Sequence, residues 1–161
     1  MSAEPVHSRA STVALLVALL TSVILLGPAL AHAFELPNKI DLPQDHYFIV
    51  QQIYRGWSFF GLVLVVQIFA LLTAAYLSRR QTPVVVPTLL AFLCVAAAQV
   101  LFWTYTYPAN AATVNWTVQP DDWERLRREW EYSHLAGAGL QFICVVGLIV
   151  AVMMRRPARG R

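Results

Sequence analysis

Charged residues and cysteine are both scarce in this sequence. Asp, Glu, Lys and Arg make up 13% of the 161 residues, about half the share of an ordinary soluble domain. The two cysteines, Cys94 and Cys144, stand alone in apolar runs, which excludes a disulfide-rich ectodomain and a CxxC redox motif. With 58% hydrophobic residues and so little charge to keep it in solution, the chain is predicted to be a small integral membrane protein in contact with the lipid bilayer.

Four apolar stretches are long enough to cross a bilayer, whose core of about 30 Å requires about 20 helical residues. They lie at 12–33, 57–77, 84–106 and 135–154, between an N-terminal segment at 1–11 and a basic tail at 155–161. This pattern predicts an all-α fold, a four-transmembrane-helix bundle with helical extensions on the outer face. The first stretch could instead be a signal peptide cut after Ala31, but its apolar run of about 20 residues exceeds the usual length of about 7–15. An uncleaved span is therefore favoured.

Positive charge is divided unevenly between the two sides of the predicted bundle. Seven of the twelve Lys and Arg residues lie in the N-terminal segment, the second loop and the tail, while the other two loops contain eight of the nine acids. The positive-inside rule then places both termini in the cytoplasm. The single lysine among these cations is typical of a GC-rich bacterium, so we expect a multi-pass protein of the bacterial inner membrane. The basic charge is explained by topology, and no nucleic-acid partner is expected.

Aromatic residues gather at the outer side. All five Trp and five of the six Tyr lie at or beyond the outer span ends, more than an interfacial belt requires, which indicates an aromatic cap or pocket there. Pro37 and Pro43 are expected to end the first helix and to begin another near Gln44. If that helix runs into the second span, one of its faces carries four polar or aromatic residues. These are Tyr47, Gln51, Tyr54 and Ser58.

The last span is also predicted to begin outside the membrane, because Pro120-Asp121-Asp122 suits the first turn of a helix. One face of that helix carries Trp123, Arg127, Trp130, His134, Gly137 and Gln141. The small residues of 136–139 are expected to allow close approach of a neighbouring helix. Gln67, Gln99 and Gln141 are expected either to bond helices together or to line a cavity inside the membrane.

Two His/Glu pairs lie at comparable depth on the outer side, His32 with Glu35 and Glu131 with His134. Each pair has the i, i+3 spacing by which carboxylate four-helix bundles hold metals. Together the four could bind one Fe, Mn or Zn ion. The alternatives are a structural hydrogen-bonded network, or acid–base chemistry on a bound organic molecule with a histidine as base. The expected cofactor is therefore none or a single transition metal.

Two motifs resemble the anthrone oxygenase-like family of small four-helix membrane proteins. They are Tyr107-Pro108-Ala109-Asn110 and the pattern Trp123-x2-Leu126-Arg127-x2-Trp130-Glu131-x2-His134, and the resemblance covers about residues 12–154. It implies a four-span bundle and, for a few members, oxidation of an anthrone to an anthraquinone without a known bound cofactor. The site residues that it implies are Pro108, Asn110, Trp123, Arg127, Trp130, Glu131 and His134.

Two functions are compatible with these features. In the first, the protein is a membrane oxygenase whose His134 and Glu131 remove a proton from a small apolar aromatic substrate while Arg127 steadies the anion. The expected substrate pocket comprises Trp123, Trp130, Asn110, Pro108, Tyr54, Gln51 and Gln141. In the second, the protein is a non-catalytic subunit or assembly factor, which docks through its aromatic cap as a homo-oligomer or on a larger membrane partner. Transport is less favoured because no span has a charge at its centre.

Overall fold

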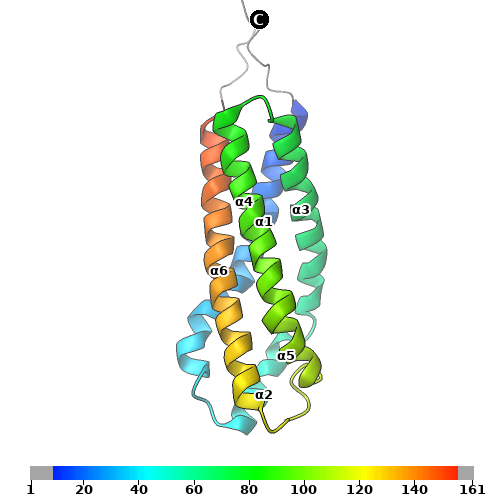
Figure 1. The fold of residues 1–161 in the computed structure, drawn as a ribbon, viewed down its shortest axis with the longest axis vertical. Coiled ribbons are helices and arrows are strands. Elements are labelled where there is room, and N and C mark those ends of the chain that lie inside the picture. The colour runs from blue at the N-terminus through cyan, green and yellow to red at the C-terminus, as the bar shows by residue number, and fades with distance from the viewer. Residues whose placement is uncertain (1–8, 156–161) are drawn as a thin grey trace, which may run out of the picture.

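Four long helices lie side by side in the computed structural model, which describes residues 9–155 (Figure 1). They are α1 (Arg9–Lys39), α3 (Phe60–Leu77), α4 (Thr82–Leu101) and α6 (Trp123–Met153). Both α3 and α6 contact α1 and α4, so the four helices close into a ring. Arg155 Nη2 donates to Ser11 Oγ at 3.2 Å, which places the start of α1 beside the end of α6. The described residues form no strand, and the predicted all-α four-helix bundle is confirmed.

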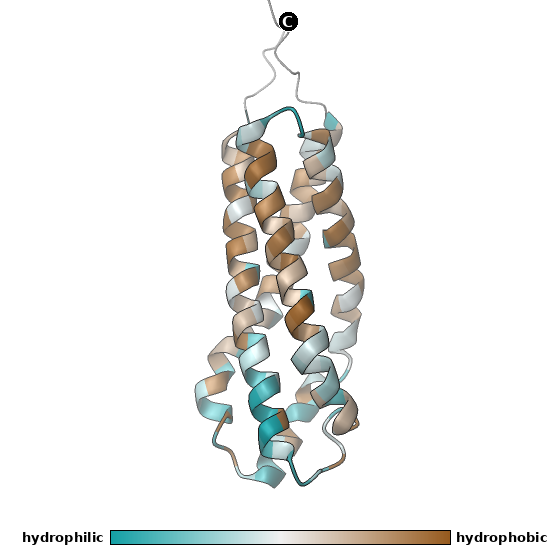
Figure 2. Ribbon diagram, viewed as in Figure 1, coloured by the Kyte–Doolittle hydropathy of each residue, from teal (hydrophilic) through white to brown (hydrophobic). Residues whose placement is uncertain are grey.

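Each of the four predicted spans matches a helix long and apolar enough to cross a membrane, and only the last extends one residue beyond its helix, to Met154. These helical segments are Arg9–Lys39, Trp57–Leu77, Thr82–Ala112 and Trp123–Met153. Figure 2 shows apolar residues along most of the bundle and hydrophilic ones at the end where α6 begins. Leu20, Leu62, Leu93 and Val100 are among the large apolar side chains exposed on the outside, as expected of a surface that faces lipid. Of the predicted terminal segments, 1–8 and 156–161 lie outside the described residues.

Small residues bring the helices close together, but not where the sequence indicated. A Cβ at Gly147 would lie 3.1 Å from the Pro87 carbonyl oxygen, so α6 and α4 meet closely there. At Gly137 and Gly139 a Cβ would meet no atom within 4 Å, so these two glycines do not provide the close approach expected at 136–139, although Ala138 between them is buried. Buried alanines such as Ala18 and Ala91 fill the core of this half of the bundle.

The glutamines at depth bond helices together. Gln67 Nε2 donates to Ser22 Oγ at 2.8 Å, and Gln141 Nε2 donates to the Ser22 carbonyl at 2.9 Å. One serine of α1 thereby connects α3 and α6. Of the two expectations for Gln67 and Gln141, interhelical bonding is the one that the structure supports, and Gln99 takes no part in these two bonds.

The chain folds back on itself at the C-terminal end of α1. α1 continues through Pro37 to Lys39, so the expectation that Pro37 ends the helix is wrong. After Pro43 come α2 (Gln44–Gln51), as predicted, and two short turns, η1 (Gln52–Tyr54) and η2 (Trp57–Phe59). Gly56 has φ +90°, a conformation that glycine adopts without strain. This turn separates α2 from the second span, so the expected continuous helical face from 47 to 58 is not formed.

A π-helical turn, η3 (Phe102–Thr106), interrupts the third span before α5 (Tyr107–Ala112). Pro108 explains the interruption, because it has no N–H to bond the carbonyl four residues earlier. The Tyr107 N–H instead donates to the Phe102 carbonyl, five residues back. Such turns widen a helix and occur frequently at functional sites.

Candidate ligand-binding cavity at the outer end of the bundle

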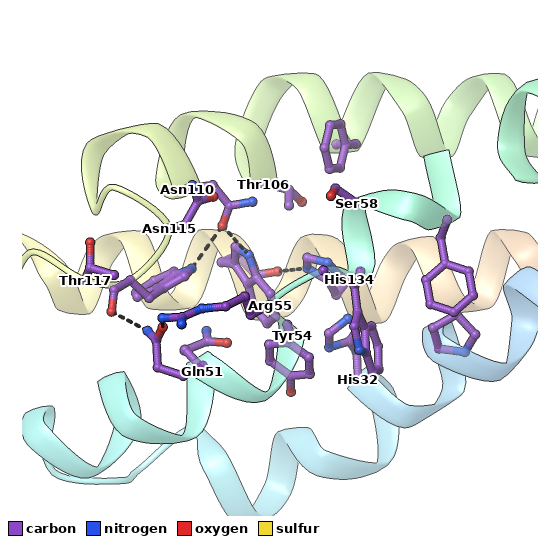
Figure 3. A pocket seen from close by; sticks show the side chains of 18 of the residues that line it. His32, Gln51, Tyr54, Arg55, Ser58, Thr106, Asn110, Asn115, Thr117 and His134 are labelled. Atoms are coloured by element: carbon purple, nitrogen blue, oxygen red, sulfur yellow. Dashed lines mark hydrogen bonds between the residues drawn. The ribbon is translucent and has the colours of Figure 1, made fainter. Parts of the chain in front are cut away.

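A cavity of about 770 Å³ opens at the end of the bundle where α6 begins (Figure 3). Its walls come from α1, from the turns at 51–60, from η3 through the loop at 114–117, and from α6. Both Phe102 and Thr106 of the π-helical turn line it, so the widening caused by Pro108 forms part of the wall. The volume falls within the range of about 300–1,000 Å³ that is typical of small-molecule sites.

His32 lies among aromatic rings on the cavity wall. Its side chain is buried, and its ring centroid lies 4.3 Å from that of His134, 4.5 Å from that of Tyr54 and 5.0 Å from that of Trp130. The Trp57 ring is 5.3 Å away on another side. The two imidazoles predicted to lie at similar depth are therefore in contact, although 102 positions separate them in the chain.

Each imidazole has a nitrogen that is free for chemistry. His134 Nδ1 lies 2.8 Å from the Trp130 carbonyl oxygen. Since a carbonyl only accepts, Nδ1 is the protonated nitrogen, and in the neutral ring Nε2 keeps its lone pair. His32 Nδ1 is buried and has no hydrogen-bond partner within residues 9–155. The cavity wall thus presents a pair of imidazoles suited to moving protons.

Asn110 fixes two indole rings of the cavity. Its Oδ1 accepts hydrogen bonds from Trp116 Nε1 at 3.0 Å and from Trp130 Nε1 at 2.9 Å. The loop that brings Trp116 to this position has three residues with positive φ, at 49°, 53° and 63° for Val114, Asn115 and Trp116. Such backbone costs about 1–2 kcal/mol per residue, and the hydrogen bond from the Trp116 backbone N–H to Thr113 Oγ1, at 3.0 Å, helps to hold it.

A buried charged network lies behind the imidazoles. Lys39 Nζ is 3.1 Å from Glu131 Oε1, and the two residues are 2% and 1% exposed. Lys39 also donates to the Tyr54 hydroxyl, and Tyr54 donates to Glu35. Tyr47 donates to Glu131 Oε1 at 2.8 Å. The network joins α1, α2 and α6 and thereby holds the aromatic wall in place.

The two tyrosines of this network are held in their neutral form. Burial raises the pKa of the Tyr47 phenol above its ordinary value, and the carboxylate of Glu131 raises it further. Burial also raises the pKa of Tyr54, as does its hydrogen bond to Glu35. Both phenols therefore act as hydrogen-bond donors to carboxylates across the whole neutral range.

The structure separates the three residues expected to be catalytic. His134 lines the cavity, whereas Glu131 and Arg127 do not. Glu131 is occupied by Lys39 and Tyr47, and Arg127 Nη1 donates to the Leu42 carbonyl at 2.8 Å. The Arg127 guanidinium also lies 4.5 Å from the centre of the Trp123 ring. Arg127 thus fastens the segment between α1 and α2 and lies outside the cavity lining.

The four residues considered as metal ligands do not come together in one site. The imidazoles of His32 and His134 meet, but the carboxylates of Glu35 and Glu131 bind Lys39 and the tyrosines. No group of three or more His, Cys, Asp or Glu side chains in the described part of the chain is placed to hold a metal ion. The imidazole pair alone offers fewer ligands than the three or four of a typical zinc site.

The expected substrate pocket is present in part, with additional members. Gln51, Tyr54, Asn110 and Trp130 line the cavity, but Trp123, Pro108 and Gln141 lie outside its lining. Lining residues that sequence reasoning missed include Arg55, Trp57, Phe102 and Trp116. The sequence does distinguish Arg55. Among the Lys and Arg residues at 39–128 on this side of the bundle, it alone has no Asp or Glu three or four positions away. The positions of Trp57 and Phe102 depend on the turn at Gly56 and on the π-helical turn, and helical periodicity in the sequence reveals neither turn.

The fold and the site define a class, a four-helix multi-pass membrane protein with an imidazole pair in an aromatic cavity at one end. No protein-family model matches the chain, and no curated protein or solved structure shows significant similarity to it.

Proposed function

We propose that the protein is a membrane enzyme that oxidises a flat, apolar, weakly acidic aromatic molecule with dioxygen, as its resemblance to the anthrone oxygenases implies. One observation carries the proposal, namely that two imidazoles with free nitrogens lie in contact on the wall of an aromatic cavity. An imidazole whose free nitrogen faces an apolar pocket is a group that can accept a carbon-bound proton.

The walls suit a flat ring system. Tyr54, Trp57, Trp116 and Trp130 contribute aromatic surface, and Phe60 and Phe102, where α3 and η3 begin, add further rings. Aromatic pairs of this kind gain about 0.5–1.5 kcal/mol beyond the burial of their area. A volume of about 770 Å³ has room for a molecule of several fused rings.

The chemistry needs no further reductant. His134 Nε2 takes one proton from a CH₂ group beside the rings, and the resulting carbanion adds dioxygen to form a hydroperoxide. Loss of water from the hydroperoxide then leaves a carbonyl, so one O₂ enters and one H₂O departs. Asn110 uses its Oδ1 for the two indoles, which leaves its Nδ2 to donate to the developing enolate oxygen. His32, in contact with His134, is placed to return the proton.

The distribution of charge supports an outward-facing site in a bacterial inner membrane. Arg9, Arg79, Arg80 and Arg155 lie at the end of the bundle opposite the cavity. With that end in the cytoplasm by the positive-inside rule, the cavity faces the outer side. Its apolar inner walls then lie within reach of molecules dissolved in the bilayer.

Part of the aromatic cap is buried inside the molecule. Tyr47, Phe48, Trp116 and Trp130 are buried against one another in a single cluster. These four rings are used within the molecule, whereas Trp103, Tyr107 and Tyr132 are exposed, so a docking subunit that uses the exposed rings remains the second candidate.

Oxygen uptake tests the proposal. Purified protein in lipid nanodiscs is supplied with anthrone, and consumption of O₂ is followed together with the absorbance of the quinone product. His134→Ala is expected to lower the rate at least about a hundredfold, and His46→Ala, which removes an exposed histidine away from the cavity, is expected to leave it unchanged. Equal rates in wild type and His134→Ala, with both proteins folded, would contradict the proposal.

A further inference from the structure

The cavity contains an arginine and no acid. Among the residues that line it, the groups able to titrate are His32, Tyr54, Arg55 and His134, and neither Asp nor Glu belongs to the lining that the structure describes. Arg55 is therefore the one lining side chain with a fixed positive charge.

Arg55 differs from the other cations at this end of the bundle. Lys39 pairs with Glu131, Arg125 with Asp122 and Glu129, and Arg128 with Glu124. Arg127 lies outside the cavity lining, against the Leu42 carbonyl. Within residues 9–155 Arg55 forms no ion pair, and its Nη2 donates to the neutral Gln52 Oε1 at 3.0 Å. Its guanidinium keeps further donors for an anion.

Local geometry aims this arginine along the cavity. Arg55 ends the η1 turn with ψ 125°, and Gly56 follows with φ +90°, so the chain turns sharply at this point. Figure 3 shows the Arg55 side chain extended toward the end with Asn115 and Thr117, while His32 and His134 lie at the other end.

The cavity is thereby divided into two chemically different ends. The guanidinium and the amides of Gln51 and Asn115 lie toward one end, and the two imidazoles lie toward the other (Figure 3). Phe60 and Phe102, where α3 and η3 begin, add apolar rings to the lining. A ligand that satisfies both ends has an anionic group and a flat apolar body.

We propose that the ligand of this cavity is an aromatic carboxylate and that Arg55 binds its carboxylate. The inference rests on the proposed function, because it assigns a substrate class to the same site. A guanidinium is matched to a carboxylate by its parallel N–H donors. One such charge-assisted contact favours an acid over its neutral analogue about tenfold.

Two probes of equal shape test the proposal, 2-anthracenecarboxylate and anthracene-2-carboxamide. Binding is followed by energy transfer from tryptophan to anthracene, with the protein in phosphatidylcholine nanodiscs, whose lipid has no net charge. Wild type is expected to bind the acid about tenfold more tightly than the amide. Arg55→Gln is expected to lose this preference and to keep its affinity for the amide. The matched control is Arg128→Gln, because Arg128 is an exposed arginine at the same end and is paired with Glu124; it is expected to keep the preference.

A cavity-filling variant separates failure of this inference from failure of the proposed function. Ala29 lines the cavity, and Ala29→Trp is expected to abolish binding of both probes. If wild type binds acid and amide equally, or if Arg55→Gln keeps the preference, while Ala29→Trp blocks both probes, Arg55 has no such role and the aromatic cavity stands. If neither probe binds, or if both bind Ala29→Trp normally, the proposed function fails together with the inference.

Discussion

Replacement of Lys39 by methionine is expected to destabilise the protein severely. Met has a similar length, so the change removes the charge and leaves most of the packing. Glu131, 1% exposed, would lose the ammonium 3.1 Å away and keep only the hydrogen bond from Tyr47. Removal of one partner from a buried ion pair costs about 3–5 kcal/mol, a large part of a typical stability of about 5–15 kcal/mol.

The second half of the prediction concerns the double variant Lys39→Met/Glu131→Gln. Because no charge then remains buried without a partner at this position, the double variant is expected to recover about 2 kcal/mol or more relative to Lys39→Met. The control is Arg128→Gln, which breaks an exposed pair whose atoms lie 3.9 Å apart. Its effect on the free energy of unfolding is expected to fall within experimental error.

The measurement is the free energy of unfolding in mixed micelles, obtained from SDS titration followed by far-ultraviolet circular dichroism. If Lys39→Met loses less than about 1 kcal/mol, or if the double variant is less stable than the single one, the network does not hold the outer end as described.

Three further predictions concern packing, the indole clamp and pH. Gly147→Ala is expected to cost about 1 kcal/mol of stability through overpacking and therefore to lower the melting temperature. Gly139→Ala, where a Cβ meets nothing within 4 Å, is expected to leave the melting temperature unchanged or raise it. Asn110→Ala leaves two indole N–H groups without their acceptor, and a loss of about 2 kcal/mol in the same SDS titration is expected. Because burial raises the pKa of Tyr47 and Tyr54, the stability due to their neutral phenols is fully present below about pH 10 and falls as the pH rises further. Melting curves between about pH 9 and 12 are therefore expected to show a shallower decline for Tyr47→Phe.

The membrane spans could be predicted because length and hydropathy determine them. A run of about 20 apolar residues has no stable alternative to a helix across the bilayer, and the runs at 12–33 and 57–77 are the clearest examples. The ends of the helices were less predictable. Pro37 lies inside α1, because the helix continues until Lys39 enters the charged network.

The cavity could be predicted only in its aromatic content and in the similar depth of the two histidines, whose contact the sequence does not show. The grouping of Glu131 with His134 followed from helical spacing, but spacing does not show that Lys39, 92 positions earlier, occupies the carboxylate. That pairing depends on how α1 crosses α6. The contribution of Phe102 likewise depends on a backbone shift caused by Pro108, which is a property of the folded helix.

Photolabelling tests the central claim most directly, namely that a flat apolar molecule binds beside His32 and His134. Benzophenone, an apolar aromatic ketone, is added to the protein in nanodiscs, irradiated, and its attachment sites are located by mass spectrometry. The account predicts labels on cavity residues such as Trp57, Phe102 and Trp130, with excess anthrone suppressing them. Labels confined to the lipid-facing surface, or cavity labels that anthrone does not reduce, would contradict it.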